Sequence, residues 1–135
     1  MIGGILMIKE KKQIVTSKAP SPAGPYSQAI IAGDFVFVAG QRPQDPATGF
    51  ISDNIQDQTK QCIKNIEAIL TEAGSSLNNI VRSDVYLSDI KNFDAMNKIY
   101  SAMMPKPFPS RTTIGVNLRN ILIEIEVIAL RGDLK

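Results

Sequence analysis

Histidine and tryptophan are missing from this chain of 135 residues, and cysteine occurs only once, as Cys62. Without histidine, neither a Ser-His-Asp nor a Cys-His catalytic group can form, so nucleophilic catalysis of those kinds is excluded. A single cysteine also rules out an internal disulfide and a zinc site built from thiolate and imidazole ligands. Any catalysis must therefore rest on carboxylates, arginine, lysine, tyrosine, hydroxyls, backbone groups and water.

Long apolar runs, phosphate-binding glycine motifs and a large net charge are also lacking. No run is long enough to span a membrane. The apolar segment Met1–Met7 is too short for a signal peptide, so we expect a short extension over residues 1–8, in which Met7 could be an alternative start. The formal charge of +2 is too small to indicate nucleic acid. The lone cysteine fits a reducing compartment, and we expect a cytoplasmic protein with no membrane partner.

The residues that are present predict one globular domain over residues 9–133, with 44% hydrophobic and 21% charged residues. Strands are expected over residues 12–16, 27–32, 35–39 and 80–87, and in two segments near the carboxyl end. Gly33-Asp34 predicts a hairpin turn between the second and third of these. The proline-containing segment Ser17–Pro25 predicts an ordered loop.

Two helices are expected between and after these strands. Apolar residues recur at helical spacing from Ile55 to Ala73, with Ser52 or Asp53 as the N-cap and Gly74 after the last turn. Cys62 lies in this apolar stripe, which indicates a small core residue rather than a reactive thiol. The second helix follows Asp89, carries Phe93, Met96, Tyr100 and Met103 on one side, and stops before Pro105.

Two helices on a sheet form an α+β layer, in which one face of the sheet is left without a helix. We expect part of the apolar surface of Val36, Val38 and the strand from Ile80 to lie on that uncovered face. Burial of such a face against copies of the same chain predicts an oligomer with sites at its seams.

The two strands near the carboxyl end combine apolar alternation with charged residues. Alternate residues from Ile121 to Ala129 are apolar and share one face, so Glu124 and Glu126 lie on the other. Arg111 and Thr113 share a face of the preceding strand. If these strands pair as neighbours, Arg111 and Glu124 line one surface, where they could bind a small carboxylic acid with a water beside it. An ordinary surface ion pair is the alternative, and this pattern alone favours it.

Several short motifs occur in order along the chain. They are Gly24-Pro25-Tyr26-Ser27-Gln28, Val38-Ala39-Gly40-Gln41-Arg42-Pro43, Asn65-Ile66 with Ala73-Gly74, Phe93 to Asn97 with Tyr100, Phe108-Pro109-Ser110-Arg111-Thr112, and Ile123 to Ala129. Together they resemble the RidA family, also called the YjgF or L-PSP family. The resemblance runs from about Lys9 to Arg131, and the specific signal is the whole set rather than any one motif.

This resemblance implies an α+β fold of the chorismate-mutase-like (bacillus) type, with a roughly six-stranded mixed sheet and two helices on one face. It implies a homotrimer with a site in each cleft between subunits. It also implies hydrolysis of reactive enamine and imine intermediates, such as 2-iminobutanoate and 2-iminopropanoate, to 2-oxo acids and ammonia. The expected partner is thus a small 2-imino or 2-oxo acid, and the chemistry requires no metal and no organic cofactor.

The resemblance also implies roles for particular residues. Arg111 matches the arginine that holds the substrate carboxylate, and Glu124 matches the glutamate that positions the attacking water. The other matching positions of the cleft are Tyr26 and Asn97, which line it, and Gly40 and Thr113, whose backbone groups meet the ligand. Tyr26 could equally be a packing residue, and Asn97 a structural polar contact.

Three positions depart from the common pattern of the family. Ala39 stands where many relatives have serine, and Thr113 where many have cysteine. Arg42 replaces a common aliphatic residue and adds positive charge near the cleft. Two other functions stay open: an endoribonuclease and translation inhibitor acting on single-stranded RNA, and a non-catalytic small-acid-binding or chaperone-like trimer. RNA is not an expected partner, because the chain has no basic stripe, histidine pair or interleaved aromatic platform.

Overall fold

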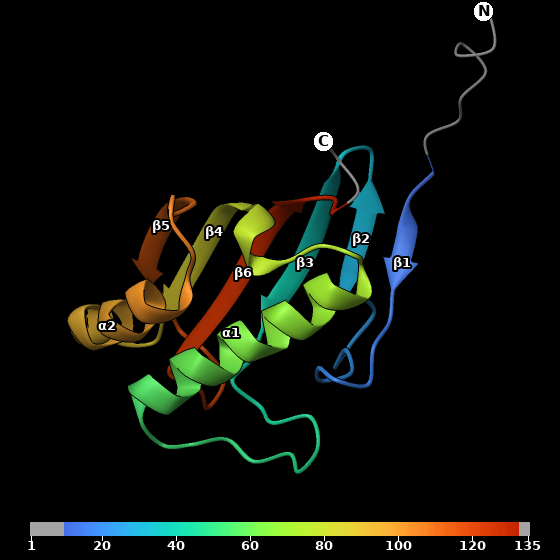
Figure 1. Ribbon diagram of the computed structural model, residues 1–135. Helices are drawn as coiled ribbons and strands as arrows, with labels where there is room; N and C mark the ends of the chain where they lie inside the picture. Colours follow the sequence, from blue (N-terminus) through green and yellow to red (C-terminus); the bar gives the residue numbers. More distant parts are fainter. Residues whose placement is uncertain (1–9, 133–135) are drawn as a thin grey trace, which may run out of the picture.

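Six strands and two α-helices follow one another in the order that the sequence predicts (Figure 1). The computed structural model describes residues 10–132, so the predicted extension over residues 1–8 lies outside the described residues. The strands are β1 (Lys12–Ile14), β2 (Ala29–Ala32), β3 (Phe35–Gln41), β4 (Ile80–Leu87), β5 (Ser110–Gly115) and β6 (Ile123–Leu130). The helices are α1 (Ile55–Glu72) and α2 (Phe93–Met103), and short 3-10 turns, η2 (Leu77–Asn79) and η3 (Ile90–Asn92), lead into β4 and α2.

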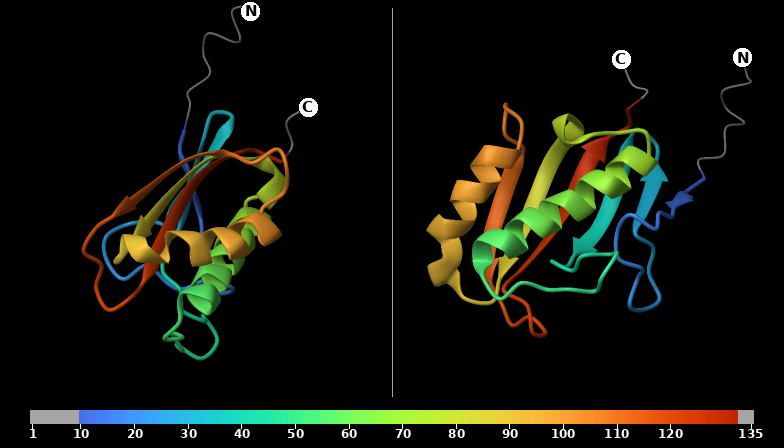
Figure 2. Two further views of the ribbon diagram at one scale, coloured as in Figure 1. Left: turned by 90° about the vertical axis from the view of Figure 1, so that its left-hand side faces the viewer. Right: turned by 60° about the horizontal axis from the view of Figure 1, so that its bottom comes forward.

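The strands form a mixed sheet in the order β1-β2-β3-β6-β4-β5. The β4–β5 pair is parallel, and the other neighbouring pairs are antiparallel. Gly33, with φ of 58°, makes the predicted turn between β2 and β3, a conformation that glycine adopts without strain. Both helices lie on one face of the sheet (Figure 2). These features confirm the expected α+β architecture.

Capping residues set the ends of α1. The N-cap is Asn54, whose side chain accepts a hydrogen bond from the Asp57 N–H at 2.8 Å and donates one to the Asp57 carboxylate at 2.9 Å. The prediction of Ser52 or Asp53 as this cap is therefore wrong. Gly74, with φ of 75°, follows the helix as predicted. Within residues 10–132, no helix has the length and apolar character needed to cross a membrane.

The core lies between the helices and the sheet. The apolar side of α1 is buried and includes Cys62, Ile63, Ile66, Ile69 and Leu70. The Cys62 thiol donates a hydrogen bond to the Gln41 carbonyl oxygen at 3.2 Å, and burial raises the pKa of this thiol. The interpretation of Cys62 as a core residue is confirmed.

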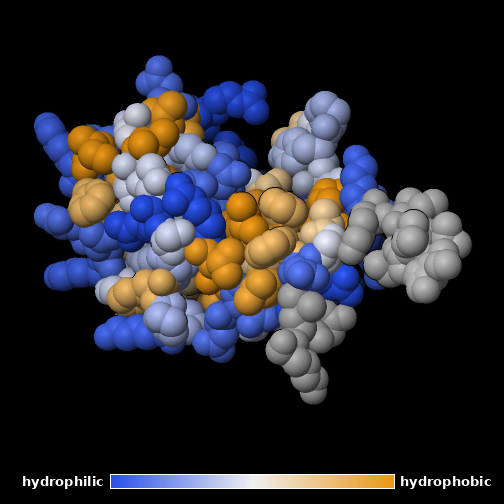
Figure 3. Space-filling model, turned by 90° about the horizontal axis from the view of Figure 1, so that it is seen from above, coloured by the Kyte–Doolittle hydropathy of each residue, from blue (hydrophilic) through white to orange (hydrophobic). Residues whose placement is uncertain are grey.

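The opposite face of the sheet carries no helix from the described residues. Phe35 and Phe37 of β3 point to this face and are 39% and 44% exposed. Val36 and Val38 alternate with them and are buried under the helices, so the prediction that they contribute to the uncovered face is wrong. Seen from above, the molecule shows a patch of hydrophobic residues bordered by hydrophilic ones (Figure 3).

Candidate functional site

Arg111 and Glu124 lie on opposite faces of the sheet. Their strands are not neighbours, because β4 lies between β5 and β6. Arg111 pairs with Ser83 of β4, whereas Glu124 pairs with Tyr86. Ser83 and Tyr86 are three residues apart, so their side chains point to opposite faces. The expectation that direct strand pairing brings Arg111 and Glu124 to one surface is therefore wrong within a single chain.

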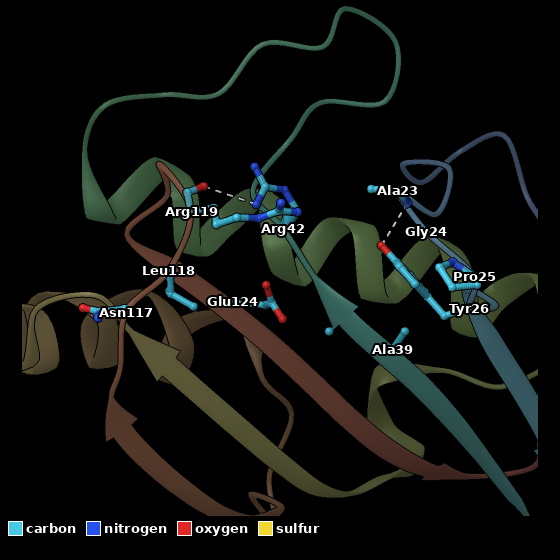
Figure 4. A pocket seen from close by; sticks show the side chains of 11 residues that line it. Ala23, Gly24, Pro25, Tyr26, Ala39, Arg42, Asn117, Leu118, Arg119 and Glu124 are labelled. Atoms are coloured by element: carbon cyan, nitrogen blue, oxygen red, sulfur yellow. Dashed lines mark hydrogen bonds between the residues drawn. The ribbon is translucent and has the colours of Figure 1, made fainter.

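Glu124 lies in a pocket of about 510 Å³, which we call the Glu124 pocket (Figure 4). The loop over residues 23–26, the end of β3 and the loop over residues 117–119 form its walls. Arg42 lines it immediately after β3, and Arg119 lines it from the loop before β6. The pocket therefore combines one carboxylate with two guanidinium groups.

A bulge in β3 leaves room for the Glu124 carboxylate. The pairing of β3 with β6 shifts between Val38 and Gln41, so Ala39 and Gly40 leave the regular ladder. A Cβ atom at position 40 would lie only 3.0 Å from Glu124 Cδ and 3.2 Å from its Cγ. Glycine at this position thus lets the carboxylate pack directly over the backbone of β3.

The two glutamates of β6 have different surroundings. Glu126 accepts a hydrogen bond from the Tyr86 hydroxyl, which raises the pKa of Tyr86 to about 12. Beside this pair, Arg82 and Asp84 form an ion pair at 2.9 Å. Within residues 10–132, by contrast, the Glu124 carboxylate has no hydrogen-bond or ion-pair partner. Glu124 is therefore the acid of this strand that is available to a water or a ligand.

Tyr26 forms one side of the Glu124 pocket from the loop before β2 (Figure 4). Its hydroxyl accepts a hydrogen bond from the Ala23 N–H at 3.0 Å. Buried Gln28 anchors this loop, because its side-chain amide donates to the carbonyl oxygens of Thr16 and Pro20 at 3.0 and 2.9 Å. The predicted ordered loop is confirmed, and it holds Tyr26 at the pocket.

Arg111 and Asn97 line a second pocket of about 460 Å³, between α2 and the edge strand β5, which we call the Arg111 pocket. The Arg111 Cζ atom lies 4.7 Å from the ring centroid of Tyr100 and 5.6 Å from that of Phe93. A guanidinium is attracted to aromatic faces at these distances. The two rings of α2 therefore hold Arg111 in place although it is half-exposed.

Three side-chain hydroxyls are buried near Arg111 on the helix-covered side of the sheet. The oxygen atoms of Ser83, Tyr100 and Thr113 have no hydrogen-bond partner among the described residues. Burial raises the pKa of Tyr100, and the nearby Ser83 hydroxyl and Arg111 charge oppose this rise. Thr113 thus contributes a buried polar side-chain atom in addition to its backbone groups.

The structure divides the predicted site residues between two pockets. Tyr26, Gly40 and Glu124 line the Glu124 pocket, Asn97 and Arg111 line the Arg111 pocket, and Thr113 follows on β5. Sequence reasoning missed Arg119, because the segment before β6 carries no periodicity or motif that marks it. It named Tyr100 as an apolar helix position and as part of a family motif but gave it no site role, although its spacing of three residues from Asn97 places both on one side of α2.

Comparison with known proteins assigns the chain to a family. The profile of the family described as Endoribonuclease L-PSP matches residues 16–131. The chain belongs to the RidA/YjgF/L-PSP family. A RutC family protein of Pyrococcus abyssi is 49% identical over 124 residues, which cover 90% of this chain and 98% of that protein. The chloroplastic Reactive Intermediate Deaminase A of Arabidopsis thaliana is 42% identical over 123 residues, which cover 88% of this chain and 66% of that protein.

Solved structures of RidA-family proteins share the fold. Yeast Mmf1 superposes with a TM-score of 0.86 at 37% identity, covering 90% of this chain and 99% of that chain. The structure of E. coli TdcF with bound serine superposes with a TM-score of 0.80 at 34% identity, covering 89% of this chain and 98% of that chain. The mixed six-stranded sheet with two helices is thus the fold of this family, as the motifs imply.

Proposed function

We propose that this protein hydrolyses 2-imino acids, such as 2-iminobutanoate and 2-iminopropanoate, to 2-oxo acids and ammonia. The observation that carries the proposal is the unpartnered carboxylate of Glu124, packed over Gly40 in a pocket of a size that suits a small molecule. Two relatives support it. The Arabidopsis relative is named a reactive intermediate deaminase, and the E. coli TdcF structure holds serine, a small molecule with a carboxylate.

The proposed site needs two copies of the chain. Because Arg111 and Glu124 lie on opposite faces of the sheet, one chain cannot bring both to one small ligand. Arg111 lies on the edge strand β5, so the edge of one copy can meet the uncovered face of another. Exposed Phe35 and Phe37 give this contact apolar surface to bury. The proposal therefore includes a closed homotrimer with sites between its subunits.

In this site Arg111 holds the substrate carboxylate with two parallel hydrogen bonds. A water next to Glu124 adds to the imine carbon and gives a proton to the carboxylate. Glu124 then returns this proton to the nitrogen of the resulting carbinolamine. As the carbon–nitrogen bond breaks, the hydroxyl oxygen forms the carbonyl of the 2-oxo acid and releases its proton to solvent, and ammonia leaves. A protonated imine is already electrophilic, so orientation and charge stabilisation suffice, and no cofactor enters the proposal. The remaining ligand contacts are assigned to Tyr26, Gly40, Asn97 and Thr113.

The description of the family profile favours cleavage of single-stranded RNA as a second candidate function. We rank it lower because the chain has no histidine and a formal charge of only +2. Few phosphate contacts are then available, and any RNA binding would weaken as the salt concentration rises. A non-catalytic acid-binding or chaperone-like trimer is ranked lower as well, since it has no use for the unpartnered carboxylate of Glu124.

A coupled assay tests the proposal. Threonine dehydratase generates 2-iminobutanoate, and the decay of its absorbance is followed with and without the protein. We expect faster decay with the wild type and roughly 100-fold slower turnover in Glu124→Gln, because the amide cannot take a proton. Binding of a stable 2-oxo acid should be largely kept in this variant.

Glu126→Gln is the matched control, since Glu126 shares the strand and face of Glu124 but is bonded to Tyr86. Its turnover should stay within a few-fold of wild type. Equal turnover of wild type and Glu124→Gln would refute the assignment of the base. If purified protein free of contaminating nuclease cleaves RNA and does not speed imine decay, the ribonuclease is the better assignment.

A further inference from the structure

The Glu124 pocket carries more positive charge than the proposed reaction uses. Arg42 and Arg119 both line it, and Arg42 Nη1 donates a hydrogen bond to the Arg119 carbonyl oxygen at 3.4 Å. Figure 4 shows the two arginines together on one side of the pocket, with Tyr26 on the opposite side. Within residues 10–132, neither guanidinium forms an ion pair with a carboxylate.

Two guanidinium groups in one pocket repel each other, and an anion that binds both relieves the repulsion. Glu124 cannot neutralise both, because the pocket holds a single carboxylate. A guanidinium pairs with a free carboxylate through two parallel hydrogen bonds, which gives such a pair both charge and directional selectivity. The chemistry of this side of the pocket is therefore that of an acceptor for an external carboxylate.

In the proposed reaction Arg111 of a second copy already binds the carboxylate next to the imine, and Glu124 is reserved for water. Arg42 and Arg119 have no role in that reaction. We infer that they bind a second carboxylate on the side chain of the substrate, so that the preferred substrates are dicarboxylic 2-imino acids. This inference rests on the proposed imine hydrolysis and names its substrate class. The reaction balances in the same way: one water adds to the imine carbon, and one ammonia leaves.

The pocket is suited to a ligand of this kind. Its volume of about 510 Å³ in a single chain lies in the range of small-molecule sites, and it is open to the second copy that supplies Arg111. Arg42 leaves β3 one residue after Gln41, which pairs with Ile125, so Arg42 comes level with Glu124 on β6. The second carboxylate would thus lie beside the reacting carbon rather than at a remote surface.

Binding and turnover together test the inference. Calorimetry compares 2-oxoglutarate with 2-oxobutanoate, which are stable dicarboxylic and monocarboxylic analogues. Turnover compares the imines that amino acid oxidases form from aspartate and from alanine. We expect the wild type to prefer the dicarboxylic compound at least about tenfold in both measurements, and Arg42→Gln and Arg119→Gln to lower that preference severalfold. Arg42→Lys should restore part of the preference.

Lys60→Gln is the matched control, because it removes the same charge from an exposed position of α1 outside this pocket. It should keep the wild-type preference. Equal affinity of the wild type for both oxo acids would overturn the inference, even if it hydrolyses 2-iminobutanoate and the proposed function stands. If the protein hydrolyses no imine but prefers the dicarboxylic oxo acid, and Arg42→Gln abolishes that preference, the proposed function is refuted. Binding of a second carboxylate by Arg42 and Arg119 would then still stand. Loss of assembly in Arg42→Gln, with ligand preference unchanged, would assign the arginine to a contact between copies and overturn the inference.

Discussion

Replacement of Gly40 by alanine should lower activity strongly while changing stability only a little. The added Cβ would lie 3.0 Å from Glu124 Cδ and 3.2 Å from Cγ, whereas carbon atoms in good contact are about 3.5–4.0 Å apart. Gly40 is not among the glycines with positive φ, so alanine fits the backbone there. Because the clash falls on the end of a flexible side chain, the carboxylate must move by roughly 0.5–1 Å while the sheet stays in place.

The size of the effect follows from this displacement. Misplacement of a catalytic group by about 1 Å costs about 100-fold in rate, or about 2.7 kcal/mol of activation free energy. The free energy of unfolding should change by less than about 1.5 kcal/mol, since a shifted rotamer of Glu124 relieves the contact. Imine decay measures the rate, and urea unfolding measures the stability.

Gly33→Ala should instead lower stability and leave activity unchanged. Gly33 has φ of 58° and no atom within 4 Å of its would-be Cβ, so alanine adds backbone strain without a clash. We expect a loss of about 1–2 kcal/mol of unfolding free energy and unchanged turnover. If Gly40→Ala acts through Glu124, the double variant with Glu124→Gln should be no slower than Glu124→Gln alone. Wild-type turnover in Gly40→Ala, or fully additive losses in the double variant, would refute the reasoning.

Three further predictions follow from the same structure. Arg111→Lys keeps the charge but loses the paired planar hydrogen bonds, so imine turnover should fall roughly ten- to a thousandfold, and wild-type turnover would contradict this role. Sedimentation should give about three times the 14.7 kDa chain mass, and a fully active monomer would contradict the shared site. The hydrogen bond to Glu126 raises the pKa of Tyr86 from 10.0 to about 12, so the folded state holds this proton more tightly than the unfolded chain does. The stability that this hydrogen bond contributes should thus be fully present below about pH 10 and be lost as the pH rises toward 12. The free energy of unfolding of Tyr86→Phe, measured with urea, should not show this loss.

Local sequence patterns were enough to predict which elements form. The helical spacing from Ile55 to Ala73 and the alternation in residues 80–87 reflect which faces of a single helix or strand must leave water. Gly74 could be placed after α1 because its positive φ is a local backbone preference. The N-cap was predicted wrongly, since Ser52, Asp53 and Asn54 can all accept a backbone hydrogen bond, and only the geometry of the first turn selects Asn54.

The candidate site depended on both levels of information. Motif resemblance singled out Arg111 and Glu124, and their roles stay a prediction. The sequence contained no sign that Glu124 packs over Gly40, because the β3 bulge arises from pairing with β6, more than eighty residues away. Nor did it indicate that Arg119 joins Arg42 in one pocket, since the two belong to distant segments.

Strand order was decided by tertiary structure alone. Alternation shows which residues of one strand share a face, but it does not show which strand lies beside it or in what register. That choice is made by backbone hydrogen bonds between distant segments, and here they place β4 between β5 and β6. The odd offset between Ser83 and Tyr86 then puts Arg111 and Glu124 on opposite faces. The chain thus carries Arg111 and Glu124 in its sequence, while strand pairing decides that one copy cannot bring them together.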